Sequence, residues 1–180
     1  MKWSITTVRL RSVWLLVPVF LILARPSPDS IAVGAVLAVA GALVRAWAAG
    51  TIRKNAVLTV TGPYAHTRNP LYLGSFLVGL GVTIASGSIA LVALFLAYFM
   101  VVYGKAMRHE ERNLEARFGD RFRDYAAAVP LFIPRLSPYR AVDVERVDFH
   151  LRRYLGHREW ELALGLAGGF GALAVKMFWF

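Results

Sequence analysis

The sequence predicts an all-α fold, a polytopic bundle of about five transmembrane helices in a single integral-membrane domain, residues 1–180. Composition is the first reason, because the chain is 57% hydrophobic, only 18% charged and has a mean hydropathy of +0.51. The second reason is arrangement, since the apolar residues form long runs and the charged residues lie between them. Long apolar runs of this kind are typical of helices that cross a bilayer.

Five apolar runs are candidate membrane helices, at residues 12–24, 31–50, 71–85, 89–103 and 161–180. We interpret the first run as a membrane helix and not as a removed signal peptide, because no small-residue cleavage site follows it. The second run is long enough to span ~30 Å of hydrocarbon. Its small residues recur at helical spacing, which favours close contact with another helix.

The third and fourth runs are separated only by Ser86-Gly87-Ser88, so we expect a helical hairpin. Each arm has 15 residues, which corresponds to ~22 Å of helix. This length is short for a full crossing, and we expect either tilt or a helix that continues into polar residues.

The polar segment after the hairpin begins with residues 105–118, which predict a continuation of the second arm into water. Gly119 is a plausible C-cap for that helix. Residues 121–128 predict another helical turn or two. The prolines that follow favour extended chain; they are Pro130, Pro134 and Pro138.

Lysine and arginine are distributed unevenly between the predicted spans. The N-terminus, residues 50–70 and residues 104–159 carry nearly all of them, whereas the turns at 25–30 and 86–88 carry one arginine between them. By the positive-inside rule, the N-terminus and both polar segments face the cytoplasm. The net charge is +10, and we expect the lysines and arginines that produce it to contact anionic membrane lipids. No nucleic-acid partner is predicted.

Two observations limit the chemistry. Cysteine is absent from the sequence, which excludes disulfides, thiolate metal sites and cysteine nucleophiles. The four histidines are scattered, so no metal site is predicted.

Arg45 is a charged residue near the end of the second apolar run. Its side chain can extend toward the lipid headgroups, as long basic side chains do. Alternatively, it can face a polar cavity inside the bundle. The sequence leaves both interpretations open.

A polar, basic segment leads directly into the third run. Within it, Arg68-Asn69-Pro70 predicts a helix that starts at Pro70, because asparagine is a favoured N-cap and proline fits the first helical position. The free amides and positive dipole end of that helix, with Arg68 beside them, suit a carboxylate or phosphate. The alternative is ordinary capping together with contact between Arg68 and lipid phosphate.

A second polar cluster, Glu110-Glu111, follows the hairpin. If the hairpin folds back on itself, this cluster meets the Arg68 segment at one membrane surface. Adjacent residues of a helix point ~100° apart, so the two glutamates face different neighbours. They either form solvated ion pairs with nearby arginines, or bind a cationic ligand, hold ribose hydroxyls or accept a proton.

Three glycines in the third run, Gly74, Gly79 and Gly81, have two interpretations. Gly74 and Gly81 are seven residues apart and lie on nearly the same helix face, whereas Gly79 lies about 160° from Gly81. Glycines in membrane helices usually mark close helix packing. They can also allow a flat ligand to approach the backbone.

Taken together, the order and spacing of these motifs resemble the integral-membrane methyltransferases, which include isoprenylcysteine carboxyl methyltransferases and phospholipid N-methyltransferases. The resemblance covers roughly residues 60–136, and no single motif is specific alone. The residues that carry it are Gly62, Pro63, Tyr64, Arg68, Pro70, Tyr72, Gly74, Gly79, Gly81, Glu110, Glu111, Leu114, Phe118, Gly119, Phe122, Tyr125, Val129, Pro130, Ile133 and Pro134.

The resemblance implies a methyltransferase-like core at about residues 51–136 and an extra C-terminal membrane helix at about 160–180. It implies S-adenosylmethionine as cofactor and a lipophilic small-molecule or lipid acceptor, at the cytoplasmic side of a bacterial inner membrane. It gives catalytic roles to Arg68, Glu110 and Glu111. The residues that it places at the cofactor are Tyr64, His66, Arg68, Asn69, Pro70, Tyr72, Gly74, Gly79, Gly81, Glu110 and Glu111.

One departure from the family pattern is Asn69, where the family usually has histidine, so the role of that ring does not carry over. Two other functions remain open. An NADPH-dependent reductase of the sterol-reductase type shares part of the motif pattern, although such proteins are much longer. A non-catalytic membrane protein is the third possibility.

Overall fold

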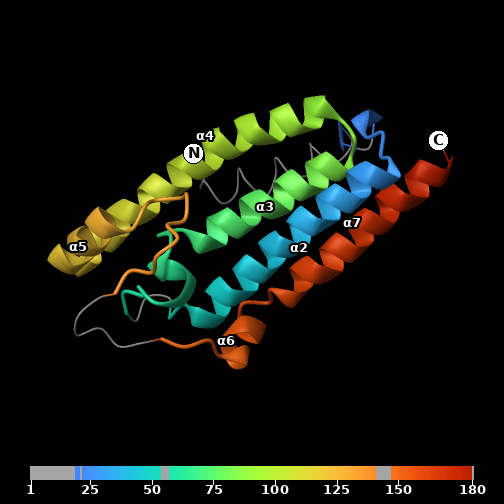
Figure 1. Cartoon of the computed structure of the whole chain (residues 1–180). Coiled ribbons are helices and arrows are strands. Elements are labelled where there is room, and N and C mark those ends of the chain that lie inside the picture. Colours follow the sequence, from blue (N-terminus) through green and yellow to red (C-terminus); the bar gives the residue numbers. More distant parts are fainter. Residues whose placement is uncertain (1–18, 21, 54–56, 141–146, 180) are drawn as a thin grey trace, which may run out of the picture.

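The computed structural model describes the chain except for residues 1–18, 21, 54–56, 141–146 and 180. Within the described part the fold is helical and has no strand, as the sequence predicts. In chain order the elements are α2 (Pro28–Thr51), η1 (Gly62–Ala65), α3 (Pro70–Ala85), α4 (Ile89–Phe118), α5 (Asp120–Ala128), α6 (Leu151–Gly156) and α7 (Trp160–Trp179). Figure 1 shows α2, α3, α4 and α7 running along one another, with α5 and α6 at the same end of the bundle. We call this end the polar end.

Three of the described helices are long and apolar enough to cross a membrane, namely Pro28–Thr51, Ile89–Phe118 and Trp160–Phe178. Helix α3 is apolar but shorter, as expected for the first arm of the hairpin. Most of the predicted run at 12–24 lies outside the described residues. The structure therefore confirms a membrane helical bundle with a hairpin.

Helix boundaries follow local capping chemistry. Helix α2 begins at Pro28, three residues before the predicted apolar run, because Ser27 and Ser30 form a capping box. Helix α4 continues past the membrane run to Phe118, as predicted. It ends where Gly119 adopts a φ of 53°, a left-handed conformation that glycine adopts at low cost.

Helices α2 and α3 pack backbone to backbone at glycines. A Cβ atom on Gly34 would lie 2.4 Å from the carbonyl oxygen of Gly81, and one on Gly41 would lie 2.6 Å from that of Gly74. Larger side chains at these positions would separate the helices. This packing fixes the start of α3 against the end of α2. It also fixes residues 62–70, which lead into α3 and which we call the motif segment.

Residues 129–139 cross the motif segment at the polar end. Three backbone hydrogen bonds hold them there, from Arg68 to Pro130 (3.0 Å), from Arg135 to His66 (2.9 Å) and from Tyr139 to Ala65 (2.9 Å). A buried cluster joins the same region to α5; it contains Val60, Phe122, Tyr125 and Val129. The loop that carries the motif is therefore supported from two directions.

Candidate functional site

The polar end contains a cavity of about 100 Å³ that is surrounded by residues from both predicted clusters. The motif segment contributes Tyr64, Arg68 and Asn69, and helix α4 contributes Glu110 and Glu111. The remaining walls are formed by Ile52, Arg53, Val57, Leu58, Thr59, Leu114, Arg117, Phe118, Phe122 and Tyr125. The hairpin thus brings two clusters that are distant in sequence around one space.

An ion pair between Arg68 and Glu111 lies beside this cavity. Nη1 of Arg68 donates to Oε1 of Glu111, and the two side chains are 14% and 27% exposed. In contrast, Nε of Arg68 is buried and has no hydrogen-bond partner among the described residues. The guanidinium group therefore keeps a donor for a further acceptor.

The hydroxyl of Tyr64 is a second buried group that lacks a partner within the described part of the chain. Pro63 begins the short helix η1, and the carbonyl of Tyr64 accepts a hydrogen bond of 2.7 Å from the hydroxyl of Tyr125. Burial, followed by the nearby Glu110 carboxylate, raises the pKa of Tyr64 above its ordinary value. Tyr64 therefore remains neutral at physiological pH and can donate its hydroxyl proton in a hydrogen bond.

Two buried donors at one small cavity that both lack a partner among the described residues are unusual in a folded protein. Most buried polar groups have a partner, and leaving one unpaired costs roughly 1–3 kcal/mol. The Tyr64 hydroxyl and the Arg68 Nε both belong to residues that line the cavity. Glu110 adds an acceptor to the same walls, so the cavity can bind a ligand that carries both acceptors and donors.

The chemistry of these groups fits S-adenosylmethionine. Its carboxylate suits Arg68, and its amino group, ribose hydroxyls and sulfonium suit carboxylates. The cavity alone is smaller than the ~300–1,000 Å³ of typical ligand sites. Arg68, Glu111 and Phe122 also line an open groove of about 730 Å³, so the cavity and this groove share part of their walls.

The other residues predicted around the cofactor have different neighbours. Asn69 is at the N-cap position before Pro70, as predicted, but its side chain does not cap the helix. Instead, Nδ2 of Asn69 donates to the carbonyl of Leu131 at 3.0 Å. His66 does not line the cavity, and its Nδ1 atom lies 2.8 Å from the carbonyl oxygen of Arg135.

Tyr72 and the three glycines also lie away from the cavity walls. The Tyr72 ring packs edge-on against another aromatic ring, that of Tyr103, with centroids 5.6 Å apart. Cβ atoms on the glycines would collide with neighbouring helices: Gly74 with Arg45 (2.4 Å), Gly79 with Phe95 (2.3 Å) and Gly81 with Gly34 (2.5 Å). The contacts of these glycines are therefore helix-packing contacts.

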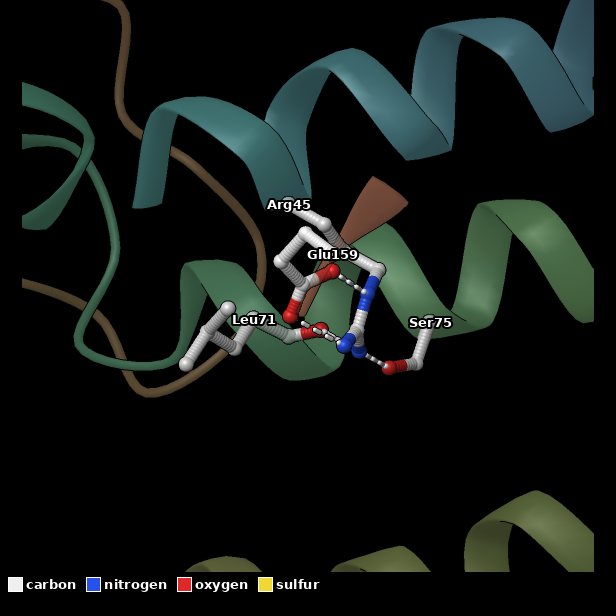
Figure 2. Close-up of polar contacts among 4 residues, drawn as sticks. All are labelled: Arg45, Leu71, Ser75 and Glu159. Carbon is white, nitrogen blue, oxygen red and sulfur yellow. Dashed lines mark hydrogen bonds and ion pairs between the residues drawn. The ribbon is translucent and has the colours of Figure 1, made fainter. Parts of the chain in front are cut away.

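Arg45 forms a second ion pair, which the sequence does not predict. Its Nε and Nη2 atoms donate to the two carboxylate oxygens of Glu159 at 2.9 and 2.7 Å. Its Nη1 atom donates to Ser75 and to the carbonyl of Leu71. Figure 2 shows the guanidinium group between α3 and Glu159. Arg45 therefore faces the inside of the bundle, and not the lipid headgroups.

The sequence contains one signal for this ion pair. An arginine in a membrane helix is costly without a partner, and Glu159 is an acid directly before the last apolar run. The signal does not identify the partner, because 114 residues separate the two. Only the position of α7 beside α2 brings them together.

The fold and the cavity define a polytopic membrane protein with a polar site at one end of its helical hairpin. The chain belongs to the phospholipid methyltransferase family, whose model matches residues 30–121, about half of the chain. The match includes both polar clusters and ends before α6 and α7.

Three relatives match parts of the chain. The cobalt-zinc-cadmium resistance protein CzcN of Cupriavidus metallidurans is 35% identical over 125 residues, which cover 68% of this chain and 57% of that protein. The protein-S-isoprenylcysteine O-methyltransferase of Schizosaccharomyces pombe is 32% identical over 81 residues, 45% and 34% of the two chains. Methanethiol S-methyltransferase 2 of Bradyrhizobium diazoefficiens is 38% identical over 82 residues, 44% and 30%. This chain thus spans less than two thirds of each relative, and no solved structure matches it significantly.

Proposed function

We propose that this protein transfers a methyl group from S-adenosylmethionine to a lipophilic acceptor at the polar end of the bundle. We place that end at the cytoplasmic face of a bacterial inner membrane, because of the lysine and arginine distribution. The main support within the structure is a pair of buried donors that have no partner among the described residues, Tyr64 Oη and Arg68 Nε, at a cavity that Glu110 also lines. Family membership supports the reaction class.

The residues of the cavity have separate roles in this proposal. Arg68 binds the cofactor carboxylate through Nε, which has no partner in the described part of the chain, while its Nη1 remains with Glu111. Tyr64 donates its hydroxyl to a cofactor oxygen or nitrogen. Glu110 offers a carboxylate to the cationic part of the cofactor, which supplies an electrophilic methyl group when bound.

Catalysis by this arrangement consists mainly of positioning and exclusion of water, because methyl transfer is an in-line displacement. A carboxylate acceptor, as in an isoprenylcysteine, needs no general base. A lipid amine is protonated at neutral pH and must lose a proton first. Glu110 or Glu111 can accept that proton, since both line the cavity.

The names of the relatives support methyl transfer but do not agree on one class of methyl acceptor. The name of the yeast relative specifies an isoprenylcysteine, and that of the Bradyrhizobium relative specifies methanethiol. The resistance protein has a name that gives no acceptor. We favour a lipophilic acceptor because the described part of the chain has three helices that are long and apolar enough to cross a membrane.

Calorimetric titration of the detergent-solubilised protein tests the cofactor. We expect S-adenosylmethionine and S-adenosylhomocysteine to bind and NADPH not to bind. Binding of NADPH alone would favour a sterol-reductase-like enzyme, and binding of none of the three would favour a non-catalytic membrane protein. Incubation with isotope-labelled S-adenosylmethionine and membrane lipid extract, followed by mass spectrometry, then identifies the methylated acceptor.

A further inference from the structure

The chain segment after α5 exposes two large apolar side chains. Figure 1 shows this segment turning back along α4 before it returns to the polar end, and we call residues 130–136 the apolar loop. Within this loop Ile133 is 77% exposed and Leu136 is 98% exposed. Single exposed apolar residues are ordinary on protein surfaces, so the depth of the loop in the bundle decides what these two side chains contact.

An aromatic residue of the apolar loop indicates that depth. The ring of Phe132 packs against Phe76 of α3 and Phe99 of α4, with centroids 5.7 Å apart in both pairs. Phe76 lies six residues after Pro70, the first residue of α3. Phe99 lies six residues before Lys105, an exposed charged residue of α4. Six residues correspond to roughly 9 Å of helix, so Phe132 packs inside the apolar part of the hairpin.

Ile133 follows Phe132 directly, and consecutive Cα atoms are ~3.8 Å apart. Its side chain therefore begins at nearly the same depth as Phe132, but it faces away from the protein. When the long apolar helices cross a bilayer, the surroundings at this depth are lipid and not bulk water. Transfer of an apolar side chain from water to such surroundings is favourable.

Polar backbone groups of the apolar loop face the motif segment. The carbonyls of Leu131 and Phe132 accept hydrogen bonds from Oγ1 of Thr67 at 3.3 and 3.0 Å. The Leu131 carbonyl also accepts a hydrogen bond from Nδ2 of Asn69 at 3.0 Å. Pro134 has no backbone N–H group. Because backbone groups that leave water need partners inside the protein, this arrangement suits a loop that lies among lipids.

The charges near the apolar loop also suit a membrane surface. Residues 129–140 contain two arginines and no acidic residue. Arg135 donates to the carbonyl of Ala128 and to Oγ of Ser137, and Arg140 is exposed. Anionic lipid headgroups attract basic residues of this kind. A lipid surface therefore complements both the apolar tip and the charge of this segment.

We propose that the apolar loop is inserted into the membrane interface at the polar end of the bundle, where the side chains of Ile133 and Leu136 contact lipid. The partner is the bilayer and not a second protein. Through the hydrogen bonds of Leu131 with Thr67 and Asn69, the inserted loop holds the motif segment at the interface. This inference goes beyond methyl transfer and does not depend on it, because it requires neither cofactor nor acceptor.

The sequence contains no cysteine, so a single introduced cysteine can carry a nitroxide spin label. The test variants are Ile133→Cys and Leu136→Cys of the full chain, in nanodiscs of phosphatidylcholine and phosphatidylglycerol. Two matched variants give the reference values. Val36→Cys lies on the exposed face of α2, in its apolar part, and Asp124→Cys lies on the exposed face of α5. All four positions are exposed or largely exposed, so each labelled protein is expected to fold.

Electron paramagnetic resonance then measures how often each label collides with oxygen, which concentrates in hydrocarbon, and with a nickel chelate, which stays in water. We expect the oxygen-to-nickel collision ratio at both loop positions to resemble that of Val36→Cys and to exceed that of Asp124→Cys several-fold. A ratio near that of Asp124→Cys at either loop position would overturn the proposal. Few collisions with both reagents at the loop positions would also overturn it, because that result means that another protein surface covers the loop.

Discussion

Two arginine–glutamate pairs link distant segments of this bundle, and they differ in how completely the arginine is bonded. Arg45 donates two hydrogen bonds to the carboxylate of Glu159 and two more to α3. Arg68 contacts Glu111 through Nη1, while its buried Nε has no partner among the described residues. The first pair contains the less exposed glutamate, 9% against 27%.

This difference separates a structural contact from a candidate ligand contact. A bidentate pair with further hydrogen bonds gains little from a ligand, and removal of one partner leaves a charge unpaired. A pair with a spare donor beside a cavity gains a hydrogen bond when a ligand supplies an acceptor. We therefore expect the Arg45 pair to determine stability and the Arg68 pair to determine binding.

The largest effect is expected for Glu159→Ala. This change leaves the partly buried Arg45 without its carboxylate and should lower the free energy of unfolding by about 3 kcal/mol. The lower part of the usual range applies because the Arg45 side chain is 25% exposed. Equilibrium unfolding of the purified protein in mixed micelles measures the change.

Two further variants serve as controls for that result. Glu161→Ala removes an ion pair with Arg158 whose side chains are 70% and 45% exposed, and such surface pairs contribute little. The double variant Arg45→Met with Glu159→Leu removes both charges together and should recover most of the loss. Equal stability of Glu159→Ala and Glu161→Ala would contradict a structural role for the Arg45 pair.

The second effect concerns binding. Arg68→Ala removes the proposed partner of the cofactor carboxylate and should weaken S-adenosylmethionine binding by about 2 kcal/mol, roughly thirtyfold. Its effect on unfolding should be smaller than that of Glu159→Ala. Calorimetry and unfolding on the same preparation give both values. If affinity is unchanged, the contact of Arg68 is with lipid or with Glu111 only.

The sequence predicts the helices well where the pattern is local. Apolar runs indicate α2, the hairpin and α7, and Asn69-Pro70 and Gly119 indicate where α3 begins and α4 ends. That the Arg68 segment and Glu110-Glu111 meet also follows from the pattern, because a short hairpin returns the chain to the same end, whereas the contact between Arg68 and Glu111 itself is a finding of the structure. For this reason five of the fifteen described residues that line the candidate cavity could be proposed before the structure.

Contacts between helices far apart in sequence could not be predicted in the same way. Apolar runs do not determine which helices are neighbours, so the sequence indicates that Arg45 needs a partner but does not identify Glu159 as that partner. The glycines show the same limit. In the sequence Gly74 fits helix packing and also leaves room for a ligand, and only the packed structure shows Arg45 beside it.

The third prediction compares the two adjacent glutamates. Both line the cavity, but Glu111 is paired with Arg68, and Glu110 has no ion pair with a described residue. Glu110→Gln should therefore weaken cofactor binding by about 1.5 kcal/mol, roughly tenfold, through loss of a charged acceptor. Glu111→Gln should have a smaller effect, because it also releases Arg68 for the ligand. If calorimetry shows equal and negligible losses of cofactor affinity for both variants, the two glutamates only face solvent on the surface of α4.

The smallest effect is expected for Tyr64→Phe, and it distinguishes most clearly between structure and binding. The hydroxyl has no partner among the described residues, so its removal should leave the free energy of unfolding unchanged or slightly raise it. Cofactor binding should weaken by about 1 kcal/mol, roughly fivefold. Tyr125→Phe is the matched control, because its hydroxyl donates to the Tyr64 carbonyl at 2.7 Å and its loss should lower stability. A destabilised Tyr64→Phe with unchanged affinity would mean that the hydroxyl serves the fold and not a ligand.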